Sequence, residues 1–437
     1  MIERLRRWHR ARGGLALDLA LYLVGTAFAA LTSVTSTLPA HREWGVIALG
    51  GYAFAASLSL SQLLAPRPPA DLEVLAGSGG SETTKTPRSA GAATAAGRAV
   101  VVVIAWLGAT VAPLVVQAVQ RAYGQPFRAQ EEVPVIEDGA ARLIDTGTPY
   151  LTRDQVSLLA EPLLGYLPYQ PGMTVFGLPR ALLGVHWYTD ARVWFALATA
   201  AALLAALHQL KAAGVADTLL IRGAQVAVLP ICALTLATGG DDLPVLALCL
   251  LALSFAARGR WWAVGFAVGT AAALKLFAWP IVAVLIIYAA TRGARAAART
   301  ALPAIGVPVA TLIPAIVMAP GAVAENLFWY PIGQGLVASP AASPLPGQLI
   351  ATLVPGGKWI ALSLLLAAGV GIGLWLLRRP PRDAGQVAAV CAVGMLTAIL
   401  LLPATRFGYL LYPAAYGIWI VLLTAGTVRI PVPSKSP

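Results

Sequence analysis

Charged residues are scarce in this chain of 437 residues, because Asp, Glu, Lys and Arg make up only 11% of it. An ordinary soluble domain carries roughly 25%. So few charges cannot cover a globule of this size, which excludes an ordinary soluble enzyme. The apolar fraction of 58% excludes disorder for most of the chain. What remains is an all-α polytopic membrane protein, since the apolar runs are continuous rather than alternating as in an outer-membrane barrel.

Cysteine and histidine are also rare, with 3 and 4 residues. Cys232, Cys249 and Cys391 all fall inside apolar runs, which favours small core residues over a disulfide. The histidines are scattered and none has metal-ligand spacing. We therefore expect no cofactor and no obligatory metal. No GxxxxGK[ST] motif occurs, which leaves out a P-loop nucleotide site.

Long apolar runs predict about twelve transmembrane helices. They cover 15–38, 45–65, 98–119, 190–210, 223–238, 243–257, 261–274, 277–291, 302–319, 358–377, 385–403 and 408–427. Several are shorter than the ~20 residues of a perpendicular span, which is tolerated where protein covers them. The run 172–186 is interpreted as a juxtamembrane or re-entrant helix on the outer face, because a crossing there would invert every later loop.

The basic residues set the predicted orientation. Lys and Arg number 31 against 19 Asp and Glu, for a net charge of +12. In a soluble chain this excess would suggest nucleic acid. Here most basic residues fall on the side that holds both termini, so the positive-inside rule places that side in the cytoplasm. We expect a multi-pass protein of the cytoplasmic (inner) membrane, with the bilayer and not nucleic acid as its partner.

Composition divides the chain into four parts. Residues 1–65 form a basic N-terminal segment and a two-span hairpin, and 66–97 a flexible cytoplasmic linker rich in Gly, Ser, Thr, Pro and Ala. Residues 98–427 form the main membrane module, and 428–437 a cytoplasmic tail. The basic start is interpreted as an anchor and not as a cleavable signal peptide, because the run that follows is too long.

Acidic residues gather in one outer loop, which spans about 120–189. Within it, residues 134–144 predict an amphipathic helix with Val135, Ala140, Leu143 and Ile144 on one face. The carboxylates of this loop can merely solvate it. Alternatively, one carboxylate just beyond the span 98–119 is a general base, and adjacent carboxylates such as Glu131 and Glu132 can raise one another's pKa toward neutrality.

Three motifs in order resemble a known family. They are LIDTGTPY (143–150), YLPYQPGMTVFGLP (166–179) and the block from ATGGDDLP to ALKLFAWP (237–280). In this order the chain resembles, over about 98–427, the polyprenyl-phosphate-dependent GT-C glycosyltransferases, and is most similar to glycosyltransferase family 87, actinobacterial mannosyltransferase-like membrane proteins. The resemblance implies a GT-C-like fold and inverting transfer of a hexose, with mannose favoured. The donor would be a polyprenyl-phosphate sugar, and the acceptor a glycan or glycolipid on the outer face.

The resemblance also implies roles for particular residues. The family has an aspartate as catalytic base in the first outer loop, and the matching position is Glu132, with Glu131 and Glu137 as competitors. An inverting transfer needs a base for the acceptor hydroxyl and cations for the donor phosphate. Arg406 is our first choice of cation because Arg can grip phosphate with two bonds, and Lys275 is second. The pair Asp241 and Asp242 is interpreted as acceptor-binding or as a helix N-cap. Sugar contacts are also expected from Tyr169 and Gln170.

Two other hypotheses stay open on the sequence. Short spans around a central Lys275 also suit a transporter or a flippase for lipids or lipid-linked sugars. A non-catalytic assembly protein would use none of the three glutamates.

Overall fold

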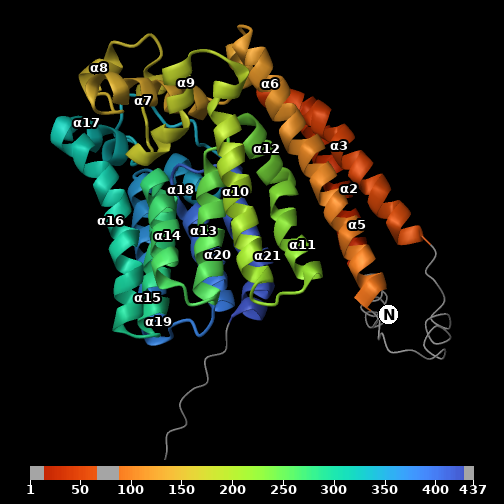
Figure 1. The fold of residues 1–437 in the computed structure, drawn as a ribbon. Coiled ribbons are helices and arrows are strands. Elements are labelled where there is room, and N and C mark those ends of the chain that lie inside the picture. Colours follow the sequence, from red (N-terminus) through yellow and green to blue (C-terminus); the bar gives the residue numbers. More distant parts are fainter. Residues whose placement is uncertain (1–13, 66–87, 428–437) are drawn as a thin grey trace, which may run out of the picture.

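The computed structural model describes residues 14–65 and 88–427, and this part of the chain is helical (Figure 1). The basic start (1–13), most of the predicted linker (66–87) and the tail (428–437) lie outside the described residues. The long and intermediate helices are α2 Leu15–Thr35, α3 Pro39–Leu64, α5 Arg88–Trp106, α6 Ala112–Ala122, α7 Glu132–Thr146, α10 Ala191–Lys211, α11 Asp217–Ala224, α12 Pro230–Thr238, α13 Asp242–Ala257, α14 Trp261–Leu274, α15 Trp279–Ala290, α16 Ala294–Met318, α18 Pro346–Leu353, α19 Gly357–Arg378, α20 Ala384–Leu401 and α21 Leu411–Gly426.

The all-α polytopic membrane class is confirmed, and each of the twelve predicted runs falls on a helix. Among the described residues, 8 helices are long and apolar enough to cross a membrane, or up to 9 if the pair α11–α12, bent by 47°, is one span. The remaining three runs are the shorter apolar helices 242–257, 261–274 and 276–290. They are largely covered by neighbouring helices, which is the condition under which short apolar helices are tolerated at membrane depth.

The helices of the structure differ in extent from two predicted boundaries. The linker was expected to end at residue 97, but α5 begins at Arg88, because the alanine-rich stretch before the apolar run has high helix propensity. The amphipathic helix predicted over 134–144 is longer, from Glu132 to Thr146. Its Val135 and Ala140 are buried as expected, whereas Ile144 is 49% exposed, in a last turn whose Asp145 and Thr146 are exposed as well.

The short elements gather at one face of the helical bundle (Figure 1). They are α7, α8 Arg153–Ser157, α9 Leu178–Leu183 and α17 Pro320–Ala324. The run 172–186 is one of them, since it holds a short 3-10 helix and α9, each too short to cross. Both ends of the described chain lie at the opposite face, where Gly14 is beside Arg222 and Gly426 is beside Val215.

The N-terminal hairpin of α2 and α3 is packed into the bundle and is not a loose appendage. Gly51 of α3 meets Gly108 so closely that a Cβ on Gly51 would lie 2.5 Å from the Gly108 carbonyl carbon. The Tyr52 hydroxyl donates to the Val228 carbonyl at 2.9 Å. Asp18 of α2 is buried and paired with Arg98 at 2.5 Å and Arg222 at 2.7 Å. This ion pair cluster joins α2 to α5 and α11.

Candidate active site

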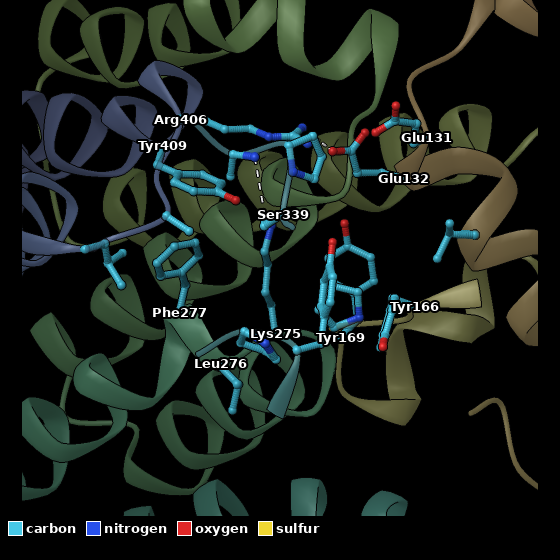
Figure 2. Close-up of a pocket in the computed structure, with 18 of the residues that line it drawn as sticks. Glu131, Glu132, Tyr166, Tyr169, Lys275, Leu276, Phe277, Ser339, Arg406 and Tyr409 are labelled. Carbon is cyan, nitrogen blue, oxygen red and sulfur yellow. Dashed lines mark hydrogen bonds and ion pairs between the residues drawn. The ribbon is translucent and has the colours of Figure 1, made fainter. Parts of the chain in front are cut away.

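A cavity of about 270 Å³ (Figure 2) is lined in part by the start of α7, which belongs to the face that carries the short helices (Figure 1). Five separate segments form its wall. They are the start of α7, the stretch 163–169, the break between α14 and α15, the loop 330–341 and the turn 402–409. Glu131, Glu132, Tyr169, Lys275 and Arg406 all line this cavity. The structure therefore brings together residues that the sequence analysis singled out from segments far apart in the chain.

Arg406 and Glu132 form an ion pair in the cavity wall (Figure 2). The guanidinium donates to one carboxylate oxygen of Glu132, while the other oxygen, Oε2, is buried and has no hydrogen-bond partner. The side chain of Glu132 is 12% exposed and that of Arg406 is 29% exposed. The site thus holds a carboxylate with one free oxygen, which can accept a proton, and a neighbouring cation, which can stabilise an anion.

The loop 330–345 holds the turn that carries Arg406. Ala342 forms an isolated parallel β-bridge with Thr405. Thr405 donates its N–H to the Ala341 carbonyl at 2.8 Å and accepts from the Ser343 N–H at 2.9 Å. The Thr405 side chain is fully buried. These hydrogen bonds fix the backbone just before Arg406, so that its long side chain extends from a rigid segment.

Glu131 lies at the exposed rim of the same cavity, next to Glu132. Partial burial raises the pKa of the Glu131 carboxyl, and the negative charge of Glu132 raises this pKa further. No bond to a cation fixes its carboxylate among the described contacts. Glu131 is thus available at the mouth of the cavity, whereas Glu132 is held inside it.

Lys275 lies in the break between α14 and α15 and is paired with two carboxylates. Its Nζ donates to Asp241 Oδ2 and to Asp242 Oδ1, both at 2.6 Å. The Tyr412 hydroxyl donates to the same Asp242 oxygen at 2.8 Å. Asp241 and Asp242 lie behind Lys275, outside the cavity lining. Asp241 occupies the N-cap position of α13 but makes no side-chain cap bond, because its carboxylate is taken by the lysine.

Aromatic rings surround the Lys275 ammonium group. It lies 5.3 Å from the ring centre of Tyr169, 5.6 Å from that of Phe277 and 5.4 Å from that of Tyr409. These distances are those of cation–π contacts. Gln170, beside Tyr169, is buried and does not line the cavity. Its backbone N–H donates to the Leu274 carbonyl, and its side-chain oxygen Oε1 has no hydrogen-bond partner.

Glu137 lies elsewhere, in a buried cluster of charges. It accepts from Arg121 at 2.6 and 2.9 Å, and Arg180 approaches it at 3.1 Å. Asp190 pairs with the same Arg121 at 3.1 Å and with Arg192 at 2.8 Å. The cluster fastens α7 to α6, α9 and α10. Glu137 does not line the cavity, because it points from the opposite side of α7 to Glu132.

One part of the wall was missed by sequence reasoning. The rings of Tyr166 and Tyr330 stack at 4.1 Å and both line the cavity. Buried Glu325 accepts from the Tyr166 hydroxyl at 2.7 Å and is approached by Arg153 at 3.5 Å. Tyr166 and Tyr330 are 164 positions apart, and no local pattern pairs residues so distant in the chain. Across residues 14–65 and 88–427, no three His, Cys, Asp or Glu side chains gather closely enough to hold a metal ion.

The fold and this cavity define a polytopic membrane protein with a charged, aromatic-walled site at one face. The model of glycosyltransferase family 87 matches residues 166–403, and the chain belongs to this family. This confirms the family expected from the sequence motifs and favours a glycosyltransferase over the transporter and assembly hypotheses. Lys275, Asp241, Asp242 and Tyr169 fall within the matched stretch, whereas Glu132 and Arg406 lie on either side of it. No curated protein and no solved structure matches the chain.

Proposed function

We propose that this membrane glycosyltransferase transfers a hexose, with mannose favoured, from a polyprenyl-phosphate donor to a glycan or glycolipid acceptor. The observation that carries the proposal is the shared cavity of a carboxylate, Glu132, and a cation, Arg406. A polyprenyl-phosphate sugar has an anionic phosphate at the membrane surface, which suits an arginine at the outer end of a bundle. From the positive-inside rule we propose that this cavity opens on the outer face of the cytoplasmic membrane, with both termini in the cytoplasm.

In the proposed reaction, the acceptor hydroxyl oxygen attacks the anomeric carbon while Glu132 takes its proton. The bond between that carbon and the phosphate oxygen breaks, and the polyprenyl phosphate leaves with the electron pair. A single displacement inverts the anomeric configuration. The phosphate is a good leaving group, so that Arg406 needs only to stabilise its charge and no strong acid is required.

The ion pair between Glu132 and Arg406 suggests how the donor prepares the base. A donor phosphate that binds Arg406 competes with Glu132 for the same guanidinium. Once displaced, the carboxylate has both oxygens available to accept the hydroxyl proton. The donor thereby activates the base that will act on the acceptor.

The other predicted residues take supporting roles in this proposal. Lys275 has two of its three donors on aspartates, so at most one remains for the phosphate, and it ranks second to Arg406. Tyr169 offers a ring in the cavity wall for the sugar. Asp241, Asp242 and Gln170 lie behind this wall, and they would reach the acceptor only if Lys275 or Tyr169 moved. Glu131 at the rim remains the alternative base. No metal enters the proposed step.

The test is Glu132→Gln in membranes supplied with labelled polyprenyl-phosphate mannose. Glutamine keeps an acceptor for Arg406 but cannot take a proton, so we expect turnover to fall by at least about a hundredfold. Glu131→Gln is the matched control, with an expected loss below about tenfold because this residue lies at the rim. Full turnover by Glu132→Gln would remove the base assignment, and a large loss by Glu131→Gln alone would move it to Glu131. If the donor is transported into vesicles and no glycosylated product forms, the transporter hypothesis would be favoured instead.

A further inference from the structure

The first turn of α3, in the N-terminal hairpin, contacts the segment that leads into the proposed base. The Gln117 amide donates to the Ala40 carbonyl at 3.0 Å. Arg128 pairs with Glu43 at 2.8 Å. Gln130 lies 2.7 Å from His41 through the side-chain nitrogens of both residues. Gln117 lies in α6, whereas Arg128 and Gln130 lie between the end of α6 and the start of α7, so the path from α6 into α7 is held from the hairpin.

Gln130 is the residue immediately before Glu131 and Glu132. Its backbone carbonyl accepts from the Val133 N–H at 3.1 Å, and its own N–H donates to the Thr238 carbonyl at 2.8 Å. Its side-chain oxygen accepts from the Thr238 hydroxyl at 3.3 Å. Gly239 makes room for it, since a Cβ there would lie 2.5 Å from that oxygen. The start of α7 is therefore fixed between α12 on one side and α3 on the other.

The hydrogen-bond roles at His41 follow from these contacts. Because the Gln130 oxygen faces Thr238, the Gln130 amide nitrogen faces His41 and donates to its Nε2. An imidazole nitrogen accepts only when it carries no proton, so this hydrogen bond requires a neutral His41 ring with its proton on Nδ1. The Gln130 amide therefore needs a side chain at position 41 that presents a hydrogen-bond acceptor.

We propose that His41 is a positioning residue, which holds the start of α7 through Gln130 and thereby sets Glu132 at its working distance from Arg406. The inference rests on the proposed function, because it assigns His41 a role only through Glu132. It also gives the N-terminal hairpin, which lies outside the matched residues 166–403, a part in the reaction. A displacement of about 1 Å at a general base can lower the rate by about a hundredfold, so that a single hydrogen bond that prevents this displacement has a large effect on turnover.

The first measurement compares variants of His41. His41→Phe keeps a ring but loses the acceptor, and we expect turnover to fall on the order of tenfold with the KM for the lipid-linked donor within about twofold. His41→Gln presents an acceptor oxygen to Gln130 and should recover most of the loss. Arg42→Gln changes the exposed neighbour on the same helix and should turn over like the parent enzyme. A fall in His41→Phe that His41→Gln does not repair would overturn the proposal.

The decisive measurement is a double-mutant cycle with Glu132→Gln. If His41 acts through Glu132, the double variant His41→Phe/Glu132→Gln turns over as Glu132→Gln does, because the base is already lost. If the two losses multiply, His41 acts independently and the inference fails while the proposed function stands. If Glu132→Gln alone keeps full turnover, the base assignment fails first and the inference fails with it.

Folding is checked on the same samples by the yield and unfolding midpoint of the detergent-extracted protein. Should His41→Phe fail to fold, Gln130→Met removes the same hydrogen bond from the other partner, and Thr238→Val is its control because the Gln130 side chain also accepts from Thr238 at 3.3 Å. Gln130→Met enters the same cycle with Glu132→Gln and has the same two outcomes.

Discussion

Replacing Lys275 by methionine would leave two adjacent buried aspartates without their shared cation. Each Nζ–carboxylate contact of 2.6 Å corresponds to an attraction of about 6 kcal/mol at an effective dielectric constant near 20. The desolvation of the three charges offsets several kcal/mol per ion. Breaking a buried ion pair by removing one partner costs about 3–5 kcal/mol. We therefore expect Lys275→Met to lower the free energy of unfolding by about that amount.

The assay is SDS titration of the purified protein in mixed micelles, followed by tryptophan fluorescence. The triple variant Lys275→Met/Asp241→Asn/Asp242→Asn removes all three charges together and should recover most of the stability. It should not recover turnover, because the cavity has lost the Lys275 charge. Lys358→Met is the matched control, since this lysine bonds the exposed Gly333 carbonyl and lies 5.7 Å from the Trp359 ring centre without pairing with a carboxylate among the described residues, and its loss should cost less than about 1 kcal/mol. A Lys275→Met protein as stable as the parent would refute the reasoning.

Three further predictions concern the buried charges outside the cavity. Glu137→Gln should lower stability by about 3 kcal/mol, measured by the same titration, and leave the donor KM unchanged, because Glu137 pairs with Arg121 away from the cavity. Burial alone would raise the pKa of Asp190, but two arginines outweigh it and hold this pKa below its ordinary value of about 4. Its stabilisation is therefore present above that pH and lost as the pH falls below it, and Asp190→Asn should flatten the acid limb of a stability–pH curve. Asp18→Asn removes the carboxylate that holds Arg98 and should make the hairpin susceptible to limited proteolysis before the rest of the bundle.

Much of the fold could be predicted because a membrane restricts the choices of the chain. A backbone in lipid must satisfy its hydrogen bonds internally, so that each long apolar run forms a helix. The order of loops and the basic residues excluded a crossing at 172–186, and the structure has only short helices there. The helix boundary at Arg88 was missed because a stretch rich in small residues can form a linker or the first turns of a helix.

Less of the site could be predicted, because its residues are far apart in the chain. Chemistry nominated Glu132 and Arg406 separately, but they are 274 positions apart, and only the packing of α7 against the turn after α20 makes them a pair. Lys275 was nominated as a phosphate ligand with no sign that Asp241 and Asp242 bind it. The stacked pair Tyr166 and Tyr330 left no local pattern at all.

The sequence by itself determined the class of protein, the positions of its helices, its family and the residue types available for chemistry. Those properties follow from composition, from apolar runs and from short ordered motifs, all of which are local in the chain. The tertiary structure decided which charges meet. It separated Glu132, which faces the cavity, from Glu137, which faces a structural cluster on the other side of the same helix. An ion pair depends on distances of a few ångströms between side chains, and only the packed bundle sets those distances.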